Sequence, residues 1–179
     1  KDEISTAQAK EIITDLAGFG APVMLFSGGE PLVQKDLVEL AHFAVGKGMR
    51  AVISTNGTLI TKEKAKELKE VGLSYVGISL DGGEEVHDKF RAVPGAFRKA
   101  LEGVENCQAE GLKVGLRFTI NKRNVQEMPT IFQLVEDMEI PRVCFYHLVY
   151  SGRGSELIKE DLDHAETRQA LDLIMDSTK

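Results

Sequence analysis

Short apolar runs recur along the chain and are separated by segments with helical spacing. The runs occupy residues 23–26, 51–54, 75–80, 114–120 and 143–148. A short apolar run bounded by turn residues is typical of a buried strand, and strands that alternate with helices favour a parallel sheet. The pattern therefore predicts five parallel strands, the first of them fully buried.

The intervening segments each carry one apolar stripe, as expected of helices that cover a sheet. Ser5 and Gln8 match a capping box that opens the first helix, and Gly18 and Gly20 are expected to end it. Further helices are predicted over residues 37–46, 61–72 and 97–111. Two more are expected after residue 124 and across 165–174, and Pro129 leaves the start of the former open.

These elements place the chain in the α/β class, as an open, partial TIM-like (β/α) barrel with about five strands present. Five strands cannot close an eight-stranded barrel, and the sequence opens on a helix. We therefore expect residues 1–179 to form one partial domain without its first strand, and a further domain to lie beyond residue 179. The edge left by a missing strand would favour self-association.

Composition and charge restrict the classes of partner. Charged residues make up 28% and hydrophobic residues 42%, which is typical of a globular domain. The net charge is -6 and no basic run stands out, which argues against a nucleic-acid partner. No apolar run is long enough to cross a membrane, and the N-terminus does not resemble a signal peptide. We therefore expect a cytoplasmic protein with no membrane contact.

The two cysteines, Cys107 and Cys144, are too few for a disulfide framework and too far apart for a metal-binding knuckle. Two small buried apolar side chains are the simplest interpretation of them. We therefore predict no metal site within this sequence.

Polar, glycine-rich loops follow the predicted strands. They contain, in order, Gly28-Gly29-Glu30-Pro31, Thr55-Asn56-Gly57, Ser79 to Gly83, Arg117 to Asn121, and His147 to Gly154. Ligands of parallel α/β sheets bind at the carboxyl ends of the strands, so these loops form the candidate site. The alternative for the first loop is a plain glycine turn with a solvated Glu30.

Three of these loops, Gly28-Gly29-Glu30-Pro31, Ser54-Thr55-Asn56-Gly57 and Ser79-Leu80-Asp81-Gly82, resemble the core motifs of radical S-adenosylmethionine enzymes. The resemblance extends from the helix before Gly28 to the strand ending at Leu148. It implies reductive cleavage of S-adenosylmethionine to a 5'-deoxyadenosyl radical that abstracts hydrogen from a substrate. An electron donor such as ferredoxin or flavodoxin is implied as well. Because the cofactor carries the difficult step, no side chain is assigned a catalytic role.

The resemblance also implies which residues contact S-adenosylmethionine. Residues Gly28, Gly29, Glu30 and Pro31 would receive the methionyl ammonium, mainly through backbone carbonyls. The remaining cofactor-binding residues implied are Thr55, Asn56, Ser79, Asp81, Arg117 and Asn121.

Each of these side chains also has an ordinary structural alternative. An Asx turn at Asn56, a buried hydroxyl at Ser79 and a helix cap at Asp81 all remain open. Arg117 is expected at the cofactor carboxylate, and its alternative is a structural pairing with Glu30 or Asp81.

The defining Cys-x3-Cys-x2-Cys motif of the family is absent from the sequence. The resemblance implies a 4Fe-4S cluster held by three thiolates, and Cys107 and Cys144 cannot replace them. We therefore expect the cluster ligands in the parent protein outside this sequence. The chain alone is expected to be inactive and to bind S-adenosylmethionine poorly.

The predicted substrate rests on the loop Tyr150-Ser151-Gly152-Arg153-Gly154, which resembles a loop of enzymes that alter tetrapyrrole side chains in haem and d-type haem biosynthesis. Arg153 would bind propionate or acetate groups, and a flexible surface loop is its alternative. His87, expected in the loop after Asp81, and His147 are further candidates for substrate contact. Peptide or sulfatase maturases and the enzyme that starts molybdopterin synthesis share the three motifs. A non-catalytic domain that binds a small molecule or a partner is the alternative from another class.

Overall fold

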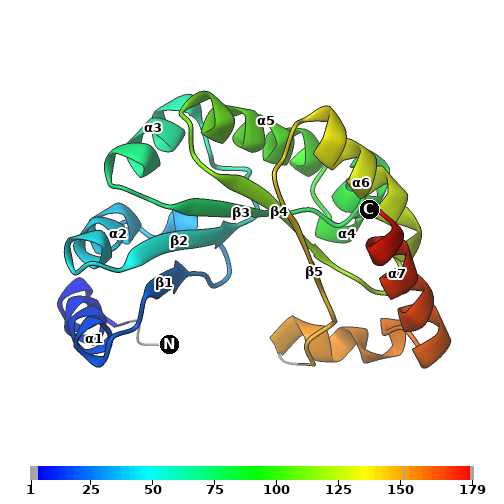
Figure 1. Ribbon diagram of the computed structural model, residues 1–179, viewed down its shortest axis with the longest axis horizontal. Coiled ribbons are helices and arrows are strands. Elements are labelled where there is room, and N and C mark those ends of the chain that lie inside the picture. The colour runs from blue at the N-terminus through cyan, green and yellow to red at the C-terminus, as the bar shows by residue number, and fades with distance from the viewer. Residues whose placement is uncertain (1–3, 151, 178–179) are drawn as a thin grey trace. The chain divides into compact units, whose positions relative to one another are not determined.

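The computed structural model describes residues 4–150 and 152–177. The chain divides into two compact units, one formed by residues up to 79 together with 98–115, and the other by residues 80–97 together with those from 116 onward. Figure 1 labels the strands and helices of both.

Five parallel strands alternate with helices, as predicted. In the first unit β1 (Val23–Phe26), β2 (Arg50–Thr55) and β3 (Tyr75–Ser79) pair in chain order, with Val23 opposite Arg50 and Val52 opposite Tyr75. In the second unit β4 (Val114–Thr119) pairs with β5 (Val143–Tyr146), and Leu116 lies opposite Val143. The prediction of an α/β fold with about five parallel strands is confirmed.

The helices of the first unit begin and end close to the predicted residues. They are α1 (Thr6–Phe19), α2 (Leu37–Gly46), α3 (Lys62–Glu70) and most of α5 (Ala96–Ala109), with a short 3-10 turn η1 (Pro31–Val33). Both hydrogen bonds of the Ser5 and Gln8 capping box are present. Gly20 follows α1 with a φ of 91°, a left-handed conformation that glycine adopts without strain.

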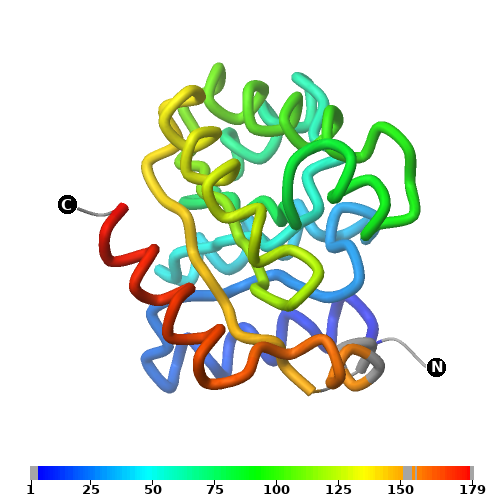
Figure 2. The backbone as a smooth tube through the Cα atoms, turned by 90° about the vertical axis from the view of Figure 1, so that its right-hand side faces the viewer, coloured from blue at the N-terminus to red at the C-terminus, as the bar shows by residue number. Residues whose placement is uncertain are grey.

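The second unit contains α4 (Glu84–Arg91), α6 (Met128–Asp137) and α7 (His164–Asp176), with 3-10 helices η2 (Val125–Glu127) and η3 (Gly152–Glu160). Figure 2 shows the chain after β5 turning through η3 into α7. Pro129 lies in the first turn of α6, where its missing N–H costs no helical hydrogen bond. Helix α4 was not predicted, and the expectation that His87 lies in a loop is wrong.

Strand β1 has one buried and one open face. Met24 and Phe26 pack against a core that includes Ile13 of α1 and Leu40 of α2, and these helices lie beside the strand in Figure 1. Leu25 points to the other face and is 47% exposed. The prediction that β1 is fully buried is therefore wrong, because α1 and α2 cover only the face that carries Met24 and Phe26.

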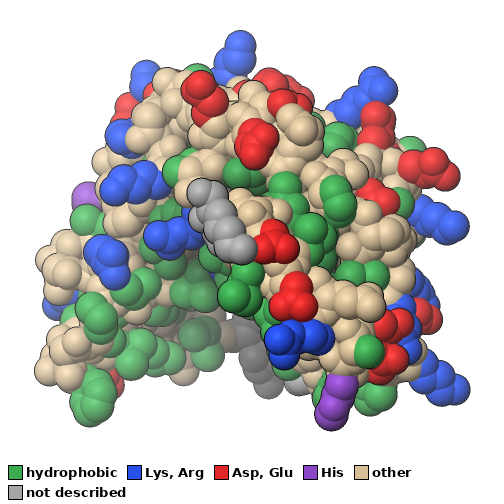
Figure 3. All heavy atoms as spheres, turned by 45° about the vertical axis from the view of Figure 1, so that its right-hand side comes forward, with side chains coloured by type: hydrophobic (Ala, Val, Ile, Leu, Met, Phe, Trp, Pro, Cys, Tyr) green, Lys and Arg blue, Asp and Glu red, His purple; other side chains and the backbone are tan. Residues whose placement is uncertain are grey.

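Within the described ranges, no helix has both the length and the apolar character needed to cross a lipid bilayer. Over the upper and right-hand parts of the face drawn in Figure 3, acidic and basic side chains lie beside one another.

Candidate functional site

The Glu30 carboxylate joins the loop after β1 to the loop after β2. Its Oε1 accepts hydrogen bonds from the backbone N–H of Leu32 at 3.0 Å and from the hydroxyl of Thr55 at 2.6 Å. Its Oε2 accepts from the backbone N–H of Asn56 at 2.8 Å. One carboxylate thus fixes the relative position of two predicted cofactor-binding loops.

The sequence around Glu30 explains this local geometry. Pro31 opens the turn η1 and is buried, while Glu30 precedes it as the N-cap residue. Gly28 adopts a φ of 152°, which other residues rarely adopt. The Glu30 side chain therefore caps the N–H two residues ahead in its own loop and also reaches the end of β2.

The backbone of Gly28 and Gly29 is open to an incoming ligand. A Cβ atom built on either glycine would have no other atom within 4 Å. The same turn lines a hollow of about 400 Å³, which residues 26–31 form together with Val33, Gln34, Leu37 and Leu40. Exposed backbone groups next to a carboxylate can accept hydrogen bonds from a cationic ligand.

Thr55 and Asn56 hold the turn that follows β2. The Thr55 side chain is 3% exposed, and its hydroxyl accepts a hydrogen bond from the N–H of Gly57 at 3.0 Å while it donates to Glu30. Asn56 Oδ1 accepts from the N–H and the hydroxyl of Thr58, at 2.9 and 2.7 Å. The alternative of an Asx turn at Asn56 is therefore present. Ser79 is half-buried at the end of β3.

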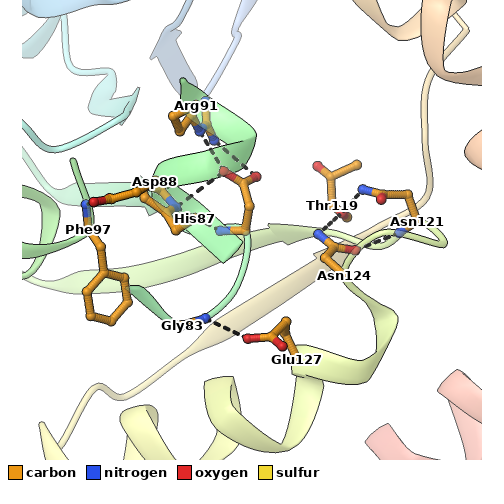
Figure 4. Close-up of polar contacts among 10 residues, drawn as sticks. Gly83, His87, Asp88, Arg91, Phe97, Thr119, Asn121, Asn124 and Glu127 are labelled. Atoms are coloured by element: carbon orange, nitrogen blue, oxygen red, sulfur yellow. Dashed lines mark hydrogen bonds and ion pairs between the residues drawn. The ribbon is translucent and has the colours of Figure 1, made fainter. Parts of the chain in front are cut away.

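In the second unit, Asp81 forms an ionic cluster with His87 and Arg91, the two partners that Figure 4 labels. Its carboxylate accepts two hydrogen bonds from the guanidinium of Arg91, at 2.5 and 3.2 Å. The backbone N–H of Asp81 donates to Nδ1 of His87 at 3.1 Å, and this nitrogen also lies 3.3 Å from the carboxylate. Asp81 is 4% exposed and His87 only 1%. The carboxylate is therefore engaged within its own unit, by partners on α4.

The surroundings of Asp81 set its charge state. Burial alone would raise the pKa of the Asp81 carboxyl, but the contacts with His87 and with the charged guanidinium of Arg91 outweigh burial and lower the pKa. Asp81 is consequently ionised at neutral pH and pairs with Arg91 as a charge-assisted bidentate contact.

Two more carboxylates fix the segment between β3 and α5. Glu127 accepts a hydrogen bond from the N–H of Gly83 at 2.9 Å, at the start of α4 (Figure 4). A Cβ on Gly82 would lie 2.8 Å from Cγ of Glu127, and the φ of 154° at this position is one that other residues rarely adopt, so glycine is favoured there. Asp88 accepts from the N–H groups of Gly95 and Phe97, and chiefly the bond from Phe97 lowers the pKa of the Asp88 carboxyl.

Asn121 and Asn124 close the loop after β4. Asn124 is fully buried, and it accepts from the N–H of Asn121 at 2.9 Å while donating to the carbonyl of Thr119 at 3.0 Å. The Asn121 amide donates to the same carbonyl and accepts from the N–H of Arg123. The side chain of Asn121 thus stabilises its own turn.

Arg117 lies on β4 and stacks on an aromatic ring of β5. Its guanidinium carbon is 4.5 Å from the centre of the Tyr146 ring. Both side chains are half-buried. The pairing with Asp81 that remained open for Arg117 does not occur among the described contacts within their unit.

The sequence model that defines the Radical SAM superfamily matches residues 1–135, which is most of this chain. The chain belongs to the Radical SAM superfamily. The prediction made from the three loop motifs is thereby confirmed.

Related Radical SAM proteins act on tetrapyrroles according to their names. The chain is 64% identical over 179 residues to Fe-coproporphyrin III synthase of Methanosarcina barkeri, covering 100% of this chain and 45% of that protein. It is 44% identical over 173 residues to pre-heme d1 synthase of Dinoroseobacter shibae, covering 97% of this chain and 43% of that protein. The chain thus spans less than half the length of these relatives.

The fold agrees with that of a solved protein structure. Streptococcus suis SuiB, bound to the precursor peptide SuiA, superposes with a TM-score of 0.83 over 98% of this chain and 40% of that protein. The sequence identity is 17%, so this likeness supports the fold and not the substrate.

The Radical SAM site residues predicted from sequence fall into separate groups. Glu30, Thr55 and Asn56 contact one another within the first unit. Asp81 and His87 contact each other within the second, whereas His147 is exposed after β5. Arg153 belongs to η3, and its side chain lies outside the part of the chain that the structure describes.

Sequence reasoning missed four residues that contact the candidate site residues or their loops: Arg91, Asn124, Glu127 and Tyr146. The sequence did contain a pattern that predicts α4, the helix that carries Arg91. Glu84 and Glu85 occupy its first turn and Lys89 and Arg91 its last, which is the charge order that the helix dipole favours. The other three lacked any local pattern that indicates their partners.

Proposed function

We propose that this chain is part of a radical S-adenosylmethionine enzyme that alters a side chain of a tetrapyrrole in haem or d-type haem biosynthesis. The observation that carries the proposal is the 64% identity to Fe-coproporphyrin III synthase along all 179 residues. The 44% identity to pre-heme d1 synthase supports the same substrate class. A shared fold alone does not imply a shared function, so the proposal rests on this sequence identity and not on the fold.

The residues of the first loop fit S-adenosylmethionine. Gly28 and Gly29 leave room for a ligand to approach the backbone, and the Glu30 carboxylate lies beside them. An ammonium group has three donors, and the carbonyl groups of an open turn can accept them. When bound and reduced by one electron, S-adenosylmethionine supplies the hydrogen-abstracting species of this family.

The chain's own residues would position and orient that cofactor. Glu30 keeps the Gly28 loop against the turn at Asn56 through its three hydrogen bonds. Since its three hydrogen bonds leave few acceptor positions on the carboxylate, Glu30 would act on the ammonium chiefly through its charge and through the shape of the loop. Arg117, which has no acidic partner among its described contacts, has its guanidinium available for a carboxylate.

The described residues do not fit a four-iron cluster. No group of three or more potential metal ligands occurs among them. Cys107 is fully buried in α5, and burial raises the pKa of its thiol to about 12, which opposes the thiolate form that iron requires. We therefore place the cluster of the whole protein on residues outside this sequence. An external electron donor, self-association and a cytoplasmic location remain predictions.

The test uses the full-length protein, reconstituted anaerobically with iron and sulfide. We expect the paramagnetic resonance signal of its reduced cluster to shift when S-adenosylmethionine is added. We also expect 5'-deoxyadenosine to form faster in the presence of an iron-bound tetrapyrrole carrying acetate or propionate groups. A cluster that does not respond to S-adenosylmethionine would refute the radical enzyme. Turnover stimulated only by a peptide would retain the enzyme class and overturn the tetrapyrrole substrate.

A further inference from the structure

Strands β4 and β5 present two chemically different faces within the second unit. Phe118 lies opposite Phe145, and their rings meet edge to face at 5.8 Å. Phe145 also packs on Phe132 of α6, at 5.4 Å between ring centres. This face is therefore the apolar side that packs against the helix.

The other face carries polar side chains. Arg117 lies opposite Cys144, and Thr119 opposite Tyr146, so alternation along the strands puts all four on one side. The guanidinium of Arg117 reaches diagonally across to the Tyr146 ring, 4.5 Å from its centre. Diagonal neighbours on parallel strands are close enough for an aromatic and a long side chain to touch.

The cation on this face lacks a counterion within the described residues. Arg117 is half-buried, and stacking on Tyr146 is the contact that it makes. A partly desolvated guanidinium without an acid is costly to keep, so its retention points to an anionic ligand. Stacking leaves the edge of the guanidinium free, and that edge matches a carboxylate through two parallel hydrogen bonds.

We propose that Tyr146 is a positioning residue that holds Arg117 on the polar face of β4 and β5, ready to receive a ligand carboxylate. The inference rests on the proposed function, because two carboxylates are then at hand: that of S-adenosylmethionine and those of the tetrapyrrole. The ring restricts the rotamers of a long flexible side chain before the ligand arrives, so less conformational entropy is lost on binding. A tyrosine hydroxyl is uncharged at neutral pH, so the ring of Tyr146 offers Arg117 a neutral face.

The experiment compares variants of the full-length protein by equilibrium binding of two probes, S-adenosylmethionine and Fe-coproporphyrin III. Arg117→Lys keeps the charge but loses the two-pronged geometry, and we expect affinity for one probe to fall about tenfold or more. Tyr146→Leu removes the ring, and the same probe should bind roughly 3- to 10-fold more weakly. Tyr146→Phe keeps the ring and should restore binding to within about twofold of wild type.

Phe145→Leu is the matched control, since Phe145 is the neighbouring aromatic residue and packs on the opposite face. It should lower the melting temperature without weakening either probe. Decarboxylated S-adenosylmethionine identifies the source of the carboxylate. If Arg117→Lys weakens binding of the intact cofactor but not of the decarboxylated analogue, the cofactor carboxylate is the ligand of Arg117. If the variant weakens binding of Fe-coproporphyrin III alone, a carboxylate of the substrate is the ligand.

Two results would overturn the inference while the proposed function stands. One is wild-type affinity of the Tyr146→Leu variant for both probes. The other is a Tyr146→Phe variant as weak as Tyr146→Leu, which would assign the effect to the hydroxyl and not to the ring. A wild-type protein that binds neither probe would instead refute the proposed function, and the inference with it.

Discussion

The hydroxyl of Thr55 donates a 2.6 Å hydrogen bond to the carboxylate of Glu30, although 25 positions separate the two residues. The same hydroxyl accepts a hydrogen bond from the N–H of Gly57. Thr55 therefore connects the loop after β1 with the turn after β2 from a nearly buried position. Two of the three loops that carry the family motifs are thus held by side chains as well as by the sheet.

Replacing Thr55 tests this connection. Thr55→Val keeps the shape but removes both hydrogen bonds, leaving the Gly57 N–H and one Glu30 oxygen without this partner, so we expect about 1–3 kcal/mol lower stability. Thr55→Ser retains the hydroxyl and is the control. Urea unfolding measures the stability of each variant, and a Thr55→Val variant as stable as Thr55→Ser would contradict the prediction.

Gly103 of α5 lies so close to the turn after β2 that a Cβ would be 2.5 Å from the carbonyl oxygen of Gly57. Gly103→Ala must push the helix and the turn apart, and we expect it to cost about 1–3 kcal/mol of stability. Gly18 of α1 is the matched control, because a Cβ there has no atom within 4 Å. Gly18→Ala should be neutral or stabilise by up to about 1 kcal/mol. Thermal unfolding measures both variants. A Gly103→Ala variant more stable than Gly18→Ala would show that α5 and the turn do not pack this closely.

The Asp81 cluster makes stability depend on pH. The folded state lowers the pKa of Asp81 below its unfolded value of about 3.9, so the stabilisation is present above about pH 4 and is lost as the pH falls further. Asp81→Asn leaves Arg91 without its charged partner, and we expect it to cost roughly 2–4 kcal/mol at pH 7.

Urea unfolding between about pH 3 and pH 7, a range that spans the ordinary pKa of a carboxyl group, measures the difference in stability between wild type and Asp81→Asn. The gap between the two proteins should be constant near neutrality and shrink in the acid range. A gap that stays the same at every pH would mean that the carboxylate charge is not what stabilises the fold.

Cys107 should resist chemical modification in the folded protein. Its side chain is fully buried, and burial raises the pKa of the thiol to about 12, so the reactive thiolate is scarce at pH 8, which lies roughly four units lower. We expect iodoacetamide to label Cys107 only after unfolding in urea, as measured by mass spectrometry of the corresponding peptide. Labelling of the native protein at the rate of the unfolded one would refute the prediction.

The strands were predictable because their apolar residues are contiguous and their ends carry turn residues. The residues 23–26 predicted for β1 are those observed. Helix α4 was missed because it is only 8 residues long and largely charged, and periodicity is weak over two turns. The exposure of Leu25 was also missed, since a short apolar run does not reveal whether helices cover one face or both.

The candidate site was predictable where its residues follow one another in the chain and not where they meet through folding. Gly28, Gly29 and Glu30 form a local motif, and so does the Asx turn at Asn56. The engagement of both Glu30 oxygens, and of Asp81 by Arg91, depends on contacts between separate elements. Residue type alone cannot tell whether a carboxylate faces a ligand or another part of its own chain.

The loop between β3 and α4 owes its shape to side chains that lie outside it. His87 accepts the N–H of Asp81 from six positions away, and Glu127 accepts the N–H of Gly83 from 44 positions away. The conformation of this loop thus depends on residues elsewhere in the chain. An engineer who wished to reshape it could leave every one of its own residues in place and change only its distant supports.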